Sequence, residues 1–174
     1  MKLIRLVPFI ALGMLGCADT HGINVSTAES NMKLSSSDAV YVARSKDGQY
    51  GTKQYTGSGA TLSQAIQSSL IRKMDNIVVA EQYQPYSDAL QYAEKHKFNY
   101  LIYPTIMHWE DRATEWSGKP DVVEVKVSVV EVNNKTVIKS GIINGKSGLF
   151  TFGGDKPQDL LGEPLNTYLD SVIE

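Results

Sequence analysis

Residues capable of acid–base chemistry gather in one short stretch of this sequence, where His108 is followed by Glu110 and Asp111. An imidazole beside a carboxylate is a common arrangement in general acid–base catalysis. Side chains alternate between the two faces of a strand, so His108 and Glu110 would share a face while Asp111 points away. No serine of the chain stands in a G-x-S-x-G elbow that would place a nucleophile beside a base. The sequence therefore predicts that the chain is not an enzyme.

Metal and nucleotide chemistry lack the residues that they require. The chain has three histidines and one cysteine, with no H-x-x-x-H pair, so we expect no metal site and no cofactor. The stretch GIINGKSG resembles a phosphate-binding loop, but Ser140 stands where the first glycine belongs, and the stretch reads as a strand. The segment TGSGAT before a helix is a better anion site, because helix N-terminal amides point outward. A mobile glycine loop explains TGSGAT equally well, and we expect no nucleotide.

Composition excludes two further classes of protein. The formal net charge is −2, and without the first 16 residues the chain has 15 basic residues (17 minus Lys2 and Arg5) against 19 acidic ones. Nucleic-acid binding depends on Lys and Arg neutralising phosphates, so no nucleic-acid partner is predicted. No stretch after Cys17 reaches the ~18 continuous apolar residues of a membrane-spanning helix. Any membrane association must therefore come from the N-terminus.

The single cysteine, Cys17, ends a segment with the features of an export signal. Two basic residues precede an apolar run from Leu6 to Leu15, which is too short for a stable membrane span. The stretch Met14-Leu15-Gly16-Cys17 resembles a bacterial lipobox, the motif after which the signal is cleaved and the cysteine acylated. A plain secretory signal followed by a coincidental cysteine is the alternative.

The lipobox resemblance implies a location and an anchor. Residues 1–16 would be the signal peptide, and fatty acids such as palmitate on Cys17 would hold the chain on a membrane. Two or more acyl chains anchor a protein stably, whereas one holds it only marginally. Ala18, where aspartate is absent, implies sorting to the outer membrane with the folded part facing the periplasm.

The most distinctive stretch for recognition contains both tryptophans of the chain. Trp109, Arg112 and Trp116 lie in one connection between two predicted strands. Tryptophan and arginine are enriched among interface residues that contribute most to binding, and loops on a rigid sheet often carry recognition. Tyr50 and Tyr55, in a glycine-rich segment, are further candidates for binding a partner protein. The alternative is that the tryptophans pack against the end of the sheet.

The elements that must position these residues follow from apolar periodicity. Residues 17–37 are polar and without periodicity, which predicts a flexible tether behind the lipidated cysteine. Residues 38–174 then form a single periplasmic domain. Strands are predicted at residues 38–44, 76–80, 99–108, 121–132 and 135–146, and helices at 61–73, 87–95 and 158–173.

This order of elements predicts an α/β (α+β) fold. Right-handed crossovers make the first three strands parallel neighbours, and the last three form an antiparallel meander. We therefore predict a five-stranded mixed sheet in the order 2-1-3-4-5, with about three helices packed largely on one face.

With the lipobox, this layout and the loop from Trp109 to Asp121, the chain resembles a family of small, uncharacterised proteobacterial lipoproteins. It is more distantly similar to periplasmic lipoprotein domains that activate peptidoglycan synthases or build the curli secretion channel. The resemblance implies an outer-membrane lipoprotein with a binding or adaptor domain and no catalytic residue. A self-assembling structural envelope lipoprotein is the main alternative, and an envelope hydrolase is a weaker one.

Overall fold

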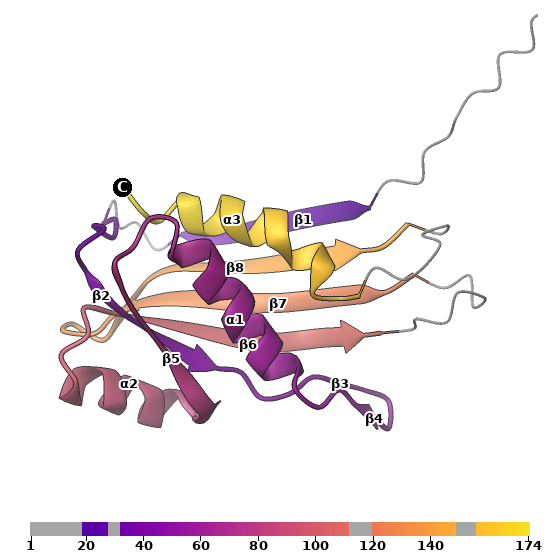
Figure 1. The fold of residues 1–174 in the computed structure, drawn as a ribbon, viewed down its shortest axis with the longest axis horizontal. Coiled ribbons are helices and arrows are strands. Elements are labelled where there is room, and N and C mark those ends of the chain that lie inside the picture. Colours follow the sequence, from indigo (N-terminus) through magenta and orange to yellow (C-terminus); the bar gives the residue numbers. More distant parts are fainter. Residues whose placement is uncertain (1–18, 28–31, 112–119, 149–155) are drawn as a thin grey trace, which may run out of the picture.

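A computed structural model describes residues 19–27, 32–111, 120–148 and 156–174. A six-stranded mixed sheet carries three α-helices and a separate two-stranded hairpin (Figure 1). Across the sheet the strands run β1 (Thr20–Thr27), β8 (Thr136–Lys146), β7 (Val122–Glu131), β6 (Tyr100–Glu110), β2 (Ala39–Arg44) and β5 (Asn76–Tyr83). The remaining elements are the hairpin β3 (Gln49–Tyr50) and β4 (Lys53–Gln54), the helices α1 (Ser58–Leu70), α2 (Tyr86–Lys95) and α3 (Gly162–Asp170), and a short 3-10 helix η1 (Asp159–Leu161).

The relative order of the five predicted strands is confirmed, but the prediction of five strands was wrong. β2 pairs in parallel with both β5 and β6, while β6, β7 and β8 form an antiparallel meander. The sixth strand, β1, pairs antiparallel with β8 at the end of the meander. It comes from the segment that the sequence predicted to be a tether.

The predicted tether over residues 17–37 is therefore corrected where the structure describes it. β1 is polar and has little apolar periodicity of its own, but the exposed edge of β8 supplies partners for its backbone groups. Further along, Leu34 is fully buried, its amide donates to the Val172 carbonyl oxygen at 2.9 Å, and it forms a bridge with Ile173. The folded part thus begins well before residue 38.

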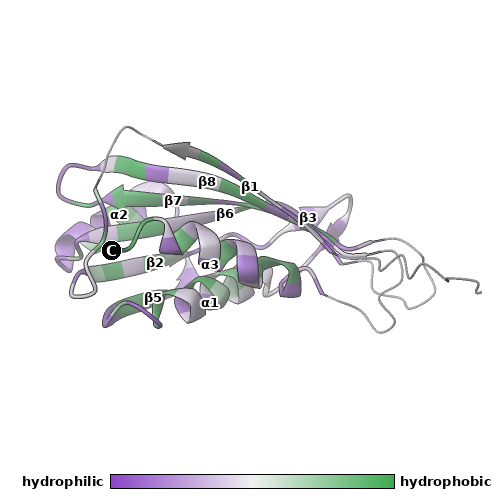
Figure 2. Ribbon diagram, turned by 90° about the horizontal axis from the view of Figure 1, so that it is seen from above, coloured by the Kyte–Doolittle hydropathy of each residue, from purple (hydrophilic) through white to green (hydrophobic). Residues whose placement is uncertain are grey.

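One face of the sheet carries the main hydrophobic core. Helices α1 and α3 lie on the same side of the sheet (Figure 2), where alternate strand residues are aliphatic and buried. From β7 these are Val123, Val125, Val127 and Val129, and from the helices Leu62, Ile66, Leu70, Leu165 and Leu169. This aliphatic layer is the reason that the strands and helices are held together.

Helix α2 covers the opposite face, so the expectation that the helices lie largely on one face holds for two of the three. Its Ala89 and Ala93 pack on a second, smaller cluster that includes Tyr41 and Leu101. These strand residues alternate with core residues such as Val40 and Ile102, which places the two clusters on opposite faces. In the described residues no helix is long and apolar enough to cross a membrane.

Candidate functional site at the carboxyl ends of the parallel strands

A shallow pocket of about 330 Å³ lies where the parallel strands β2 and β5 end. It is lined by Arg44, Ser45, Lys46, Asp47, Gln54, Gln82 and Tyr83. In open sheets with parallel strands, ligands commonly bind outside the carboxyl ends of the strands. Arg44 closes β2, Tyr83 closes β5, and the two residues are register partners. We call this the carboxyl-end pocket.

Asp47, one of the residues that line the carboxyl-end pocket, caps the start of α1. The Asp47 carboxylate accepts hydrogen bonds from the amides of Gly57 (3.0 Å) and Gly59 (2.8 Å). Gly57 is in the left-handed region with φ 90°, and a Cβ on Gly59 would lie 2.1 Å from the Ser45 carbonyl oxygen. Both glycines are therefore needed for the chain to approach this closely.

This cap changes the interpretation of the TGSGAT segment. Two of its amides, which would bind an anion, already bind the chain's own carboxylate. The helix also begins at Ser58, whereas the sequence predicted a start at Thr61. The early start follows from the cap, because Asp47 satisfies amides that lie before Thr61. A mobile loop is not needed to explain the glycines.

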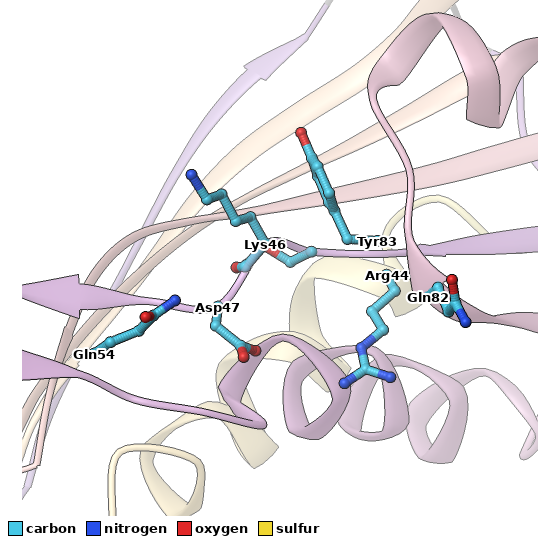
Figure 3. Close-up of a pocket in the computed structure, with 7 residues that line it drawn as sticks. Arg44, Lys46, Asp47, Gln54, Gln82 and Tyr83 are labelled. Atoms are coloured by element: carbon cyan, nitrogen blue, oxygen red, sulfur yellow. The ribbon is translucent and has the colours of Figure 1, made fainter.

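The side chains of the carboxyl-end pocket divide into two groups. Lys46 and Tyr83 extend to one side, whereas Arg44 and Asp47 point to the other (Figure 3). The Arg44 Nη1 donates to the Glu81 carbonyl oxygen at 2.5 Å, which holds the guanidinium against β5. Lys46 is exposed, and so is Tyr83 (49%). An ammonium group beside an exposed phenol can bind carboxylate and hydroxyl groups.

Ser45 is the one serine that lines the pocket, and backbone groups occupy its hydroxyl. Its Oγ donates to the Lys46 carbonyl oxygen at 3.0 Å and accepts from the Ile106 amide at 3.2 Å. No histidine or cysteine is among the seven lining residues. The backbone therefore holds the Ser45 hydroxyl in place, while the lysine, glutamine and tyrosine side chains of the pocket can donate hydrogen bonds to a ligand.

The two tyrosines predicted as binding residues lie near each other at this end of the sheet. The Tyr50 ring meets the His108 ring edge-on, with 5.0 Å between centroids. Lys53 lies 4.6 Å above the Tyr55 ring centroid and donates to the Asp111 carbonyl oxygen at 3.3 Å. The hairpin β3–β4 is therefore docked on the end of β6, and Tyr50 remains 44% exposed.

Trp109 is not an accessible binding residue, which corrects that part of the prediction. It is 3% exposed and belongs to the main core. A Cβ on Gly48 would lie 2.6 Å from the Trp109 Cβ, so the chain before β3 packs directly on the tryptophan. Trp109 covers the end of the core, as the alternative interpretation expected. Cys17, Arg112 and Trp116 lie outside the described residues.

His108 and Glu110 share a face, as strand alternation predicted. The His108 Nε2 lies 3.3 Å from the Glu110 Oε2, and the glutamate side chain is 6% exposed against 32% for the histidine. In the described part of the chain, no group of three or more His, Cys, Asp or Glu residues is placed to bind a metal ion.

Comparison of the sequence with protein families identifies the domain. A family model described as domain of unknown function DUF4823 matches residues 32–172. The chain belongs to the DUF4823 family. No curated protein matches its sequence. The match covers the carboxyl-end pocket and the hairpin, so both belong to the DUF4823 domain.

Solved structures share the fold of this DUF4823 domain at low sequence identity. PelC from Paraburkholderia phytofirmans, solved as a dodecamer, has a TM-score of 0.67 and 13% identity, covering 89% of this chain and 99% of the PelC chain. Lipoprotein GNA1162 from Neisseria meningitidis has a TM-score of 0.53 and 11% identity, covering 78% of this chain and 97% of that one. The DUF4823 domain therefore has a fold that also occurs in a bacterial lipoprotein.

Sequence reasoning missed the residues of the carboxyl-end pocket. Arg44, Lys46 and Tyr83 belong to no motif, and 39 positions separate Arg44 from Tyr83. The available signal was topological: two predicted neighbouring parallel strands bring their last residues to the same edge of the sheet. Applied to β2 and β5, that rule identifies Arg44 and Tyr83, the last residues of the two strands, which both line the pocket.

Proposed function

We propose that this DUF4823 protein is an outer-membrane lipoprotein whose periplasmic domain binds another component of the cell envelope and has no catalytic role. The observation that carries the proposal is the N-terminus, where an apolar segment leads into Gly16-Cys17. Its support from structure is the fold shared with a lipoprotein of Neisseria meningitidis. Acyl chains on Cys17 would insert into the bilayer and leave the folded domain in water.

Substitution at Cys17 tests the anchor. The unmodified full-length chain, expressed in a Gram-negative host with an alkyne analogue of palmitate, should carry the label and sediment with membranes. Cys17→Ser should lose the label and leave the membrane fraction. An unlabelled, soluble wild-type chain would contradict the anchor.

A second variant tests the choice of membrane. By the sorting behaviour of similar lipoproteins, Ala18→Asp should move the labelled protein from the outer to the inner membrane in a sucrose gradient. Both chains should carry equal label, because Cys17 is present in each. Wild-type protein in the inner-membrane fraction would contradict the outer-membrane assignment and leave lipidation standing.

The carboxyl-end pocket is the surface that we propose for binding, with Lys46 and Tyr83 as the contacting residues. Their ammonium and phenol groups suit a partner that presents carboxylates or hydroxyls. In-cell crosslinking followed by mass spectrometry should identify a partner that is lost from Lys46→Ala/Tyr83→Ala. The control Lys126→Ala removes one exposed lysine elsewhere on the sheet and should keep the partner. Equal loss in both variants would contradict this assignment.

Self-assembly is the second candidate function. The observation that favours it is the fold shared with PelC, which was solved as a dodecamer. The mass of the mature lipoprotein in detergent, measured by light scattering with the detergent contribution subtracted, decides the question. A monomer mass at all concentrations would contradict self-assembly.

A further inference from the structure

β1 is a regular strand at one edge of the sheet, and it lacks the features that usually protect an edge strand from pairing with another chain. Its eight residues, Thr20 to Thr27, pair with β8 in an unbroken register. The sequence THGINVST contains no Lys, Arg, Asp, Glu or Pro. Natural sheets protect their edges with such residues or with bulges, because unpaired backbone groups otherwise bind another strand. No described strand lies beyond β1.

The opposite edge of the sheet shows what protection looks like in this molecule. β5 contains an irregularity in its pairing with β2, because Val42 pairs with Val79 whereas Arg44 pairs with Tyr83. It also contains Glu81, whose carbonyl oxygen is bound by Arg44. A bulge and a charge make β5 a poor template for strand addition. The two edges therefore differ, and β1 is the open one.

A groove runs beside β1 because α3 sits close to β8. A Cβ on Gly141 would lie 2.6 Å from the Tyr168 ring, so α3 lies directly over β8. Between α3 and β1, a groove of about 300 Å³ is lined by His21, Ile23, Glu163, Pro164 and Thr167. Val25 pairs with Gly141 in the ladder, faces the same side, and is 44% exposed. Among the described residues, the edge thus combines backbone groups that pair with no further strand and the apolar side chains of Ile23 and Val25.

We propose that β1 is a dimer interface, in which its outer edge pairs antiparallel with β1 of a second copy. Pairing about a two-fold axis at Asn24 sets Ile23 of one copy opposite Val25 of the other, on the α3 side of both sheets. Antiparallel cross-strand pairs of β-branched residues stabilise a sheet. The two grooves then lie on the same face of the joined sheet, one on each side of the two-fold axis.

The strand's own composition is the reason for choosing a second copy as the occupant. Two-fold pairing brings identical segments together, which like charges would oppose. β1 has no Lys, Arg, Asp or Glu that would repel its copy. Residues of equal parity meet in this register, so the apolar residues Ile23 and Val25 meet each other and Asn24 meets Asn24. The proposal rests on the self-assembly candidate above and specifies its surface.

A single cysteine on the two-fold axis tests the register. Cα atoms of directly opposed antiparallel residues lie about 4.5–5.5 Å apart, which a disulfide can span. The mature lipoprotein in detergent with Asn24→Cys should form a dimer on mild oxidation that a reductant reverses. The unmodified chain controls for Cys17, and Val137→Cys, at an exposed position of β8 (39%), controls for random collision. An Asn24→Cys yield no higher than that of Val137→Cys would overturn the interface.

A charge introduced on β1 provides a second test of the dimer interface. Val25→Lys should weaken dimerisation in detergent by about tenfold or more, because it removes both apolar pairs and protects the edge. Val137→Lys changes the same residue type at similar exposure and should have no effect. Thermal melting of both variants checks that they fold. An unchanged dimer in Val25→Lys would overturn the proposal.

The outcomes separate this proposal from those on which it rests. If Val25→Lys still forms oligomers and Asn24→Cys forms no crosslink, self-assembly stands and the β1 interface is refuted. A wild-type monomer would refute both, while lipidation of Cys17 is measured independently. A disulfide adduct with a mass other than twice the chain would identify a different protein as the occupant and refute the second copy.

Discussion

On one face of the sheet, α1 and α3 bury a continuous aliphatic layer, whereas on the other face α2 alone covers β2 and β6 with alanines and tyrosines. The first face holds large side chains with no exposure, such as Leu62, Ile66 and Leu165. The second has half-exposed rings and, over β7 and β8, polar residues such as the hydrogen-bonded pair Ser128 and Ser140.

Most of the stability of the domain therefore comes from the α1/α3 face. Burial of apolar area is the main favourable term in folding, at roughly 25 cal/mol per Å². The α1/α3 face holds most of that area, so changes there should threaten the fold. The α2 face should tolerate change, because its helix contributes small side chains. Substitutions on the two faces should therefore differ in their cost to the free energy of unfolding.

A matched pair of leucines gives the strongest test. Leu165→Ala on α3 should lower the free energy of unfolding by about 2–5 kcal/mol, because the side chain is fully buried and leaves a cavity. Leu90→Ala on α2 should cost clearly less, since Leu90 is only partly buried. Urea denaturation measures both. Equal losses would contradict the assignment of stability to the α1/α3 face.

The N-terminal cap of α1 should contribute more to stability than the N-terminus of α2, in line with the contrast between the two faces. Asp47→Ala should cost about 1–2 kcal/mol, because two amides at the start of α1 lose their acceptor. The N-cap residue of α2 makes no side-chain hydrogen bond, and Asp88 is the one acidic residue in the first turn of this helix. Asp88→Ala should therefore cost only about 0.3–1 kcal/mol through the helix dipole. Denaturant midpoints compare the two, and a larger loss for Asp88→Ala would reverse the interpretation.

Tyr168 links stability on the α1/α3 face to pH. Its hydroxyl donates to the Val127 carbonyl oxygen at 2.9 Å, so Tyr168→Phe should cost about 1 kcal/mol at pH 7. Burial raises the pKa of Tyr168 above its ordinary value of 10.0. Above pH 10 the unfolded chain loses this proton while the folded chain keeps it, so stability falls as pH rises. Thermal melting from pH 8 to 11 should show a smaller alkaline loss in Tyr168→Phe.

Tyr86 on the α2 face should give the smallest effect. It is 39% exposed and meets Tyr103 edge-on at 5.3 Å between centroids. Tyr86→Ala should cost at most about 1 kcal/mol, the value of one aromatic pair. Tyr86→Phe keeps the ring and serves as the control. A loss comparable to that of Leu165→Ala would show that the α2 face is also part of the stabilising core.

The sequence predicted the elements in which the local pattern of apolar and polar residues shows which side chains are buried. β7 alternates valine with polar residues, which identified it as a strand with one wet face, and β8 followed after the turn at Asn133-Asn134. Chain order and handedness were then sufficient for the relative order of five strands. The shared face of His108 and Glu110 was predicted for the same reason, since alternation along a strand is a local property.

The candidate site could be predicted only in part, because its contacts join distant segments. Tyr50 and Tyr55 were chosen for their residue type, and the structure places their hairpin against the end of β6. The burial of Trp109 depends on Gly48, which lies 61 positions away. Its residue type favoured an exposed tryptophan that binds a partner, but the chain before β3 packs on Trp109 and buries it.

Alone, the sequence determined the elements with strong periodicity and the lipobox-like segment that ends at Cys17, because each depends on neighbouring residues. Chain order and crossover handedness determined the relative order of five strands. Only the tertiary structure decided that polar β1 becomes an edge strand, that Asp47 caps a helix ten residues further on, and that β2 and β5 end together in a pocket. The physical reason is that a backbone amide or carboxylate can be satisfied by any partner within reach. Which partner comes within reach is settled by the packing of the whole domain.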